Sequence, residues 1–100
     1  GFDYVLANTL RPAALGLSRT LADELAEFGI TVNTVPPGFI DTDMTRELSE
    51  EQRALMLGQI PLGRLGAADE IAALVAFICS DAAAYITGET VHINGGMYMA

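Results

Sequence analysis

The strongest constraint on the fold lies in residues 30–45, ITVNTVPPGFIDTDMT, where a β-branched run ends abruptly in Pro-Pro-Gly. Residues 31–35 predict a buried strand. The two prolines cannot continue a hydrogen-bonded ladder, and Gly38 allows the backbone to approach a ligand closely. In open α/β sheets, ligands bind just beyond the carboxyl ends of the strands. The segment therefore fits a ligand-binding strand exit, and it fits an ordinary strand exit equally well.

An amphipathic helix is expected directly before this strand, over residues 8–28. Its apolar residues recur at spacings of four, four and three, which form one helix face: Leu17, Leu21, Leu25 and Phe28. Gly29 then supplies a helix stop, and the strand begins at once. Direct passage from helix to strand is typical of βαβ architecture.

Three further elements are expected after the Pro-Pro-Gly loop. The capping-box sequence Ser-Glu-Glu-Gln at 49–52 predicts a helix over 49–59. Apolar residues at i, i+3, i+4 and i+7 from Ile71 predict another over 67–80, followed by a short turn at 81–85. Residues 90–93 read as a final strand that ends in Asn94-Gly95-Gly96. The predicted order is helix, strand, helix, helix, strand.

The charge balance limits the partners. Thirteen Asp and Glu residues face five Arg and no Lys, for a formal net charge of -8. Such a surface disfavours nucleic acid, because the arginines are scattered along the chain rather than clustered. The apolar runs are too short to span a bilayer, so no membrane partner is expected.

The single cysteine and the start of the chain bear on the compartment. No charged segment followed by an apolar run opens the sequence, so nothing marks it for secretion. Cys79 alone cannot form an internal disulfide, which fits a reducing cytoplasm. We expect Cys79 to be a buried apolar residue of the helix over 67–80.

Other candidate site residues carry weaker signals. His92 has no second His or Cys nearby, so no metal site is predicted. Asp41 and Asp43 could be paired acids, but solvated or helix-capping carboxylates are the favoured interpretation. No G-x-G-x-x-G turn is present, so the sequence holds no phosphate cradle of that type, and we expect the 100-residue chain alone to bind NADPH or NADH weakly.

Over residues 11–100, the chain resembles the short-chain dehydrogenase/reductase family. The segments that carry the resemblance are GITVNTVPPGFIDTDMT, IPLGRLGAADEIAALVAFICSDAAAYITGE and TVHINGGMYM. They most resemble the bacterial 3-oxoacyl-[acyl-carrier-protein] reductases of fatty acid biosynthesis. The resemblance implies an α/β fold in which residues 1–100 are the C-terminal segment of a doubly wound Rossmann-type parallel sheet, without the N-terminal dinucleotide-binding half.

The same resemblance implies a function. Family members are NADP- or NAD-dependent oxidoreductases, usually tetramers, that move a hydride to a carbonyl. It implies a 3-oxoacyl thioester or similar acyl-carrier-protein-linked substrate and a homo-oligomer, tetramer or dimer. By this resemblance Pro37, Gly38 and the backbone of Ile40 face the nicotinamide carboxamide, and Thr42 approaches the pyrophosphate.

The family's catalytic Tyr-x-x-x-Lys motif is where this sequence departs. Relative to Gly16, typical members place the tyrosine nine residues upstream and the lysine five, and these positions hold Ala7 and Arg11. A rival alignment uses Tyr4 with Asn8, but on a helix its three extra residues leave the pair about 60° and roughly 4.5 Å displaced. We therefore favour Ala7 and Arg11 as the occupants, with Tyr4 as the alternative acid.

This departure leaves several functions open. Alanine has no proton to give, whereas Arg11 can still hydrogen-bond the nicotinamide ribose. Arg11 is equally well explained as a surface helix residue. The sequence therefore predicts a reductase in its complete form, with a catalytically silent ligand-binding member or an oligomerisation fragment as alternatives.

Overall fold

The computed structural model describes residues 3–6 and 11–97, and of residues 3–6 and 11–15 it describes the backbone alone. In chain order the elements are β1 (Asp3–Leu6), α1 (Arg11–Leu25), a 3₁₀ turn (Ala26–Phe28), β2 (Thr31–Thr34), α2 (Asp43–Arg46), α3 (Glu50–Gly58), α4 (Ala68–Ile78) and a second 3₁₀ turn (Asp81–Ala83).

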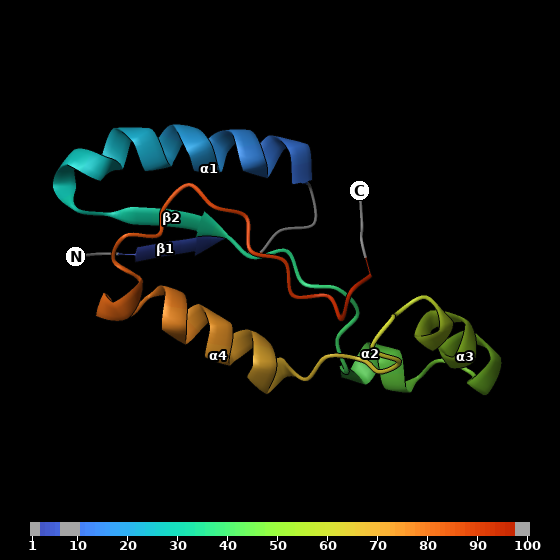
Figure 1. Cartoon of the computed structure of the whole chain (residues 1–100). Helices are drawn as coiled ribbons and strands as arrows, with labels where there is room; N and C mark the ends of the chain where they lie inside the picture. The colour runs from blue at the N-terminus through green and yellow to red at the C-terminus, as the bar shows by residue number, and fades with distance from the viewer. Residues whose placement is uncertain (1–2, 7–10, 98–100) are drawn as a thin grey trace.

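A βαβ unit forms the centre of the molecule. β1 and β2 pair in parallel, with Tyr4 opposite Val32 and Leu6 opposite Thr34. Helix α1 covers one side of the two strands and α4 lies on the other, as Figure 1 shows. This layering agrees with the predicted α/β class. β1 was not predicted, because four residues carry too little pattern to indicate a strand without a neighbour to pair with.

β2 is the most buried element among the described residues. All four of its residues are buried, and Val35, which follows it, is buried as well. The strand begins where predicted because Gly29 takes the left-handed conformation, with φ of 72°, and donates its N–H to the carbonyl of Ala26. The predicted helix stop and buried strand are both confirmed.

The predicted final strand over 90–93 is wrong as a regular strand, although its position beside β2 is right. The segment meets β2 and the loop after it through isolated parallel bridges, Thr34 to Thr90 and Pro37 to Ile93. Pro36 has no N–H to donate at the position between these two bridges, so the ladder is interrupted there. The proline thus interrupts the pairing of both segments.

The helices over 49–59 and 67–80 were predicted within two residues of α3 and α4 at each end. The short helix α2 was not. Along α1 and the 3₁₀ turn after it, the burial differs from the predicted apolar face: Ser18 and Ala22 are buried, whereas Leu17 and Phe28 are 55% and 66% exposed. Cys79 is exposed, so its prediction as a buried residue is wrong.

The molecule is elongated, measuring 50 × 25 × 22 Å. Helices α2 and α3 project from one end of the βαβ unit, beyond the carboxyl end of β2 (Figure 1). Among the described residues, no helix combines the length and the apolar character needed to cross a bilayer.

Candidate functional site

The loop that leaves β2, residues 36–41, is called the Pro-Gly junction here. Its glycine is required by the chain itself: a Cβ built on Gly38 lies 2.8 Å from the Cα and 2.9 Å from the Cβ of Asn94. The Gly38 N–H donates to the Ile93 carbonyl at 2.9 Å. The close approach that Gly38 permits is therefore made, in this structure, to another segment of the same chain.

The turn Asn94-Gly95-Gly96 connects the junction to the segment between α3 and α4, residues 60–67, called the return loop. Gly95 has a φ of 63°, and a Cβ on it would lie 2.7 Å from Ile60 Cγ2. Its carbonyl accepts the Leu62 N–H at 3.0 Å. Three segments distant in sequence thus meet at the carboxyl end of β2.

The return loop also pairs directly with the Pro-Gly junction. The Gly66 N–H donates to the Phe39 carbonyl at 2.9 Å, and the Asp41 N–H donates to the Gly66 carbonyl at 2.8 Å. These two bonds form a parallel bridge between Ile40 and Gly66. Because the bridge uses groups of the flanking residues, the N–H and C=O of Ile40 itself point to the opposite edge. Within the described residues, the Ile40 N–H donates no hydrogen bond.

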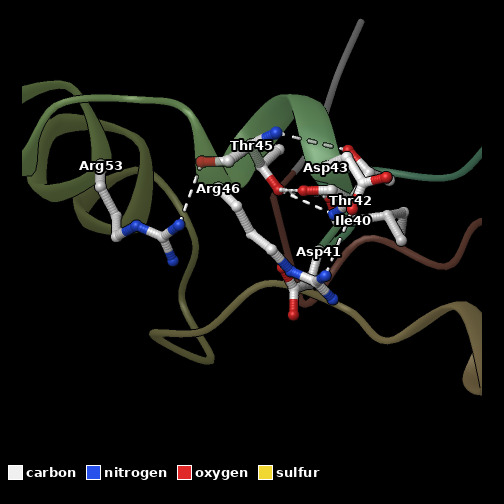
Figure 2. Close-up of polar contacts among 7 residues, drawn as sticks. All are labelled: Ile40, Asp41, Thr42, Asp43, Thr45, Arg46 and Arg53. Atoms are coloured by element: carbon white, nitrogen blue, oxygen red, sulfur yellow. Dashed lines mark hydrogen bonds and ion pairs between the residues drawn. The ribbon is translucent and has the colours of Figure 1, made fainter.

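Thr42 follows the junction and caps α2. Its hydroxyl accepts the Thr45 N–H, and its own N–H donates to Thr45 Oγ1 at 2.8 Å, as Figure 2 shows. Thr45 Oγ1 lies 2.8 Å from the Thr42 carbonyl and 3.3 Å from that of Ile40. The Thr42 hydroxyl serves this cap as an acceptor, so its hydrogen stays available for a further acceptor.

Asp41 of the junction and Asp43 of α2 both pair with one arginine, Arg46. Arg46 reaches Asp41 at 3.2 Å and Asp43 at 3.3 Å, and Arg53 donates to the Thr45 carbonyl at 3.0 Å (Figure 2). Asp43 lies in the first turn of α2. Both ion pairs are exposed, so they contribute little to stability. This arrangement agrees with the solvated, helix-end interpretation of the carboxylates rather than with a pair of catalytic acids.

A second charged pair lies behind the junction, between the return loop and α4. Arg64 forms two parallel hydrogen bonds to Glu70, at 2.7 and 3.0 Å. Glu70 Oε1 also accepts the Ala67 N–H at 3.0 Å, so Glu70 caps the start of α4. The Arg64 hydrogen bond, with the Ala67 N–H second, lowers the pKa of Glu70 from its ordinary 4.5 to about 2. The pair is therefore fully charged at neutral pH.

A cavity of about 110 Å³ lies between the junction, the return loop and α4. Its lining is mostly apolar and includes Phe39, Leu62, Ile71 and Ile93. Pockets that hold cofactors are typically about 300–1,000 Å³. This cavity is therefore too small to hold a dinucleotide.

Of the residues predicted to bind the cofactor, Pro37, Gly38 and Ile40 lie in the junction, and Thr42 directly after it caps α2. The predicted catalytic residues are described less fully. Tyr4 lies in β1 and Arg11 is the first residue of α1, whereas Ala7 and Asn8 lie outside the described residues. The displacement calculated above treats Tyr4 as a helix residue, and this is wrong because Tyr4 lies on a strand.

Sequence reasoning missed the residues that hold the junction from behind, namely Arg64, Gly66, Glu70 and Asn94. One signal was available: Glu70 stands three residues after Ala67, which is half of a capping box. His92 is exposed, and no group of three or more His, Cys, Asp or Glu side chains gathers in the described part of the chain.

The sequence of this chain is similar to those of known proteins. Residues 3–98 match the family described as Enoyl-(Acyl carrier protein) reductase. The chain is 67% identical over 85 residues to a protein named 3-oxoacyl-[acyl-carrier-protein] reductase FabG in Escherichia coli K12, and 66% identical to the protein of that name in Salmonella typhimurium. The corresponding Vibrio cholerae protein is 57% identical over 89 residues.

These matches cover most of this chain and a minor part of each relative. The two enteric alignments include 85% of this chain and 35% of the relative, and the Vibrio alignment includes 89% and 36%. The chain thus spans about a third of the length of the curated relatives it matches. A family match over 3–98 with an α/β layout of the expected kind leads to one conclusion: this chain belongs to the short-chain dehydrogenase/reductase family, whose fold is of the Rossmann α/β type.

Proposed function

We propose that this chain forms the nicotinamide end of an NADP- or NAD-dependent reductase that acts on a 3-oxoacyl thioester attached to an acyl carrier protein. The observation that carries the proposal is the identity of 66 to 67% over 85 residues with relatives named for that reaction. Identity of this extent includes the Pro-Gly junction, the return loop and α4, which together form the candidate site.

The junction supplies groups that suit a nicotinamide carboxamide. The Ile40 N–H points away from the Gly66 bridge and is available to donate to a carboxamide oxygen. Pro37 and Gly38 shape the loop beside it, and the Thr42 hydroxyl retains a hydrogen for a pyrophosphate oxygen. A bound nicotinamide would supply the hydride for the carbonyl. The residues of this chain would bind and orient it, with Arg11 at the ribose.

Carbonyl reduction also needs a proton for the oxygen of the new alcohol. In the favoured register Ala7 stands at the acid position and cannot supply this proton, whereas in the rival register Tyr4 can. If the first register is correct, the proton must come from solvent or from a group on the substrate, and we expect slow turnover. The second gives an ordinary acid, placed on β1 rather than on a helix.

The names found by comparison describe two different reactions. The family description names an enoyl reductase, which reduces a carbon–carbon double bond, and the individual relatives are named for reduction of a 3-oxo group. We favour the 3-oxo group, because a relative that is 66% identical constrains a site more tightly than membership of a family does. A catalytically silent ligand-binding member remains the alternative for a chain with Ala7 at the acid position.

The deciding experiment uses the complete protein carrying this sequence. Purified protein is given NADPH or NADH with a 3-oxoacyl thioester in one arm and a 2-enoyl thioester in the other. Consumption of the reduced cofactor is followed by absorbance, and we expect it with the 3-oxoacyl substrate. Turnover of the enoyl substrate alone would contradict the proposal, and cofactor binding without turnover of either would identify the silent member.

The acid is assigned in the same protein by substitution. With Ala7 at the acid position, Ala7→Tyr combined with Arg11→Lys raises ketone reduction, since general acid catalysis is worth about 10² to 10⁴ in rate. Tyr4→Phe then changes little. If Tyr4→Phe instead abolishes an existing activity, Tyr4 is the acid and the favoured register is wrong.

An oligomerisation role is the second candidate, and one observation favours it. Leu17 of α1, Phe28 of the 3₁₀ turn that follows it and Phe77 of α4 are each at least half exposed, at 55%, 66% and 50%. Large apolar side chains that a chain leaves uncovered on two helices suit contacts with other subunits or with further parts of the fold.

A further inference from the structure

The orientation of Ile40 depends on Gly66, because the bridge between them fixes the peptide groups on both sides of Ile40. The two bonds of this bridge measure 2.8 and 2.9 Å. Gly66 also lies directly under the Ile40 side chain: a Cβ on Gly66 would be 2.9 Å from Ile40 Cδ1. Any displacement of Gly66 therefore turns the Ile40 N–H.

Gly66 is in turn held from both sides by one ion pair. Arg64 Nη1 donates to the Leu65 carbonyl at 3.1 Å, immediately before Gly66. Glu70 Oε1 accepts the Ala67 N–H at 3.0 Å, immediately after it. The two side chains join each other through the bidentate contact at 2.7 and 3.0 Å. The peptide groups that flank Gly66 are thus braced against each other.

This pair is better suited to fixing geometry than to stabilising the fold. The side chains of Arg64 and Glu70 are 58% and 43% exposed, and exposed ion pairs contribute little to stability. A bidentate contact between arginine and a carboxylate nevertheless fixes relative orientation, because both groups are planar and the two bonds are parallel. Arg64 belongs to the return loop and Glu70, six residues later, to α4. The pair therefore connects the return loop to α4.

We propose that Arg64 and Glu70 are a positioning pair: they hold Gly66 in register with Ile40 and thereby aim the Ile40 N–H at the nicotinamide. This inference rests on the proposed function, since it assigns a role in orienting the cofactor. Neither residue touches the reacting atoms. Their effect passes through the Gly66 backbone.

The test uses the complete protein carrying this sequence and measures the binding of two probes. One probe is the reduced dinucleotide that the protein prefers, and the other is the matching ADP-ribose compound, which lacks the nicotinamide ring. Glu70→Ala removes the ion pair and the cap together. Arg64→Lys keeps the charge and loses the fork, and Glu70→Gln keeps an oxygen for the Ala67 N–H.

We expect Glu70→Ala to weaken dinucleotide binding about 10-fold, roughly the effect of losing the one hydrogen bond that the Ile40 N–H donates. For Arg64→Lys and Glu70→Gln, we expect dinucleotide affinities between those of Glu70→Ala and the unaltered protein. Binding of the ADP-ribose compound stays unchanged in all three. The matched control is Asp69→Asn, which removes one negative charge from the neighbouring position in the first turn of α4 and leaves both affinities unchanged.

Other outcomes overturn the inference in distinguishable ways. If the unaltered protein binds neither probe, the proposed function fails and the positioning role fails with it. If it binds both and Glu70→Ala matches Asp69→Asn, the function stands and the pair has no positioning role. Equal weakening of both probes with a lowered melting temperature would show that the pair supports the fold in general.

Discussion

The Pro-Gly junction and the outer faces of the two long helices differ in how completely this chain determines them. Gly38 of the junction and Gly95 of the turn packed beside it meet backbone or side-chain atoms at distances that leave no space for a methyl group. By contrast, Leu17 of α1, Phe28 of the 3₁₀ turn after α1 and Phe77 of α4 remain at least half exposed. The chain packs the loops at its candidate site against one another and leaves these outer apolar side chains exposed.

The largest expected effect comes from filling the junction. Gly38→Ala places a Cβ 2.8 Å from the Cα of Asn94, a backbone atom that cannot rotate away. We expect it to lower the free energy of unfolding by about 3 kcal/mol, near the upper end for overpacking. Chemical denaturation of the protein carrying this sequence measures the change.

The control for that substitution is Gly16→Ala, within α1. No described residue lies within 4 Å of a Cβ at Gly16. Replacing a helix-interior glycine by alanine should stabilise the protein by roughly 0.5 to 1 kcal/mol. Similar changes in the free energy of unfolding for Gly38→Ala and Gly16→Ala would show that the junction is packed no more tightly than the surface of α1.

A somewhat smaller loss is expected at Asn33, which is fully buried in β2. Its amide donates to the Ile86 carbonyl at 3.1 Å and accepts the Glu89 N–H at 3.1 Å. Asn33→Ala leaves both backbone groups without these partners, at an expected cost of about 2 kcal/mol. Hydrogen exchange of the Glu89 amide should speed up, and an unchanged exchange rate would show that this segment is held by other contacts.

The helix faces should matter for association rather than for folding. Phe28→Glu puts a charge on an exposed apolar position of the 3₁₀ turn after α1. We therefore expect the dissociation constant of an oligomer to rise about 10-fold, or about 1.4 kcal/mol. Sedimentation over a range of concentrations measures this, with Leu55→Gln on α3 as the control at another exposed apolar site. A stable, compact monomer of the unaltered protein at tens of micromolar, roughly where modest interfaces assemble, would contradict it.

The smallest effect concerns acid stability at the Arg64–Glu70 pair. The pKa of Glu70 is lowered from 4.5 to about 2, chiefly by the Arg64 hydrogen bond. A carboxylate whose pKa is lowered by folding stabilises the folded state when the pH is above the pKa of the unfolded chain. This stabilisation is lost as the pH falls through the pKa of the folded state. The unfolding free energies of the unaltered protein and Glu70→Gln should therefore differ above pH 4.5 and converge towards pH 2. In an Arg64→Ala background this convergence should largely disappear.

Local signals allowed much of the fold to be predicted. The capping box at Ser49, the left-handed Gly29 and the apolar spacing from Ile71 each depend on neighbouring residues, and the corresponding elements lie where expected. β1 and the failure of residues 90–93 to form a regular strand depend on pairing with distant segments, which spacing does not reveal. Similarly, the Pro-Gly junction was picked out as a candidate site from its Pro-Pro-Gly sequence, whereas the contacts of Arg64 and Asn94 beside it became apparent only from the fold.

The contacts between β2 and residues 86–93 also set the order in which the molecule can be made. The Val32 N–H donates to the hydroxyl of Thr87, 55 residues further along the chain. The Gly38 N–H donates to the carbonyl of Ile93, which is also far along the sequence. The pairing of β2 with β1 and the packing of α1 on it involve residues 3–34 alone, so they can form before the later segments are synthesised. The Pro-Gly junction, in contrast, closes only after nearly the whole of this sequence has been synthesised, so its glycines and buried Asn33 spend much of synthesis without their native neighbours.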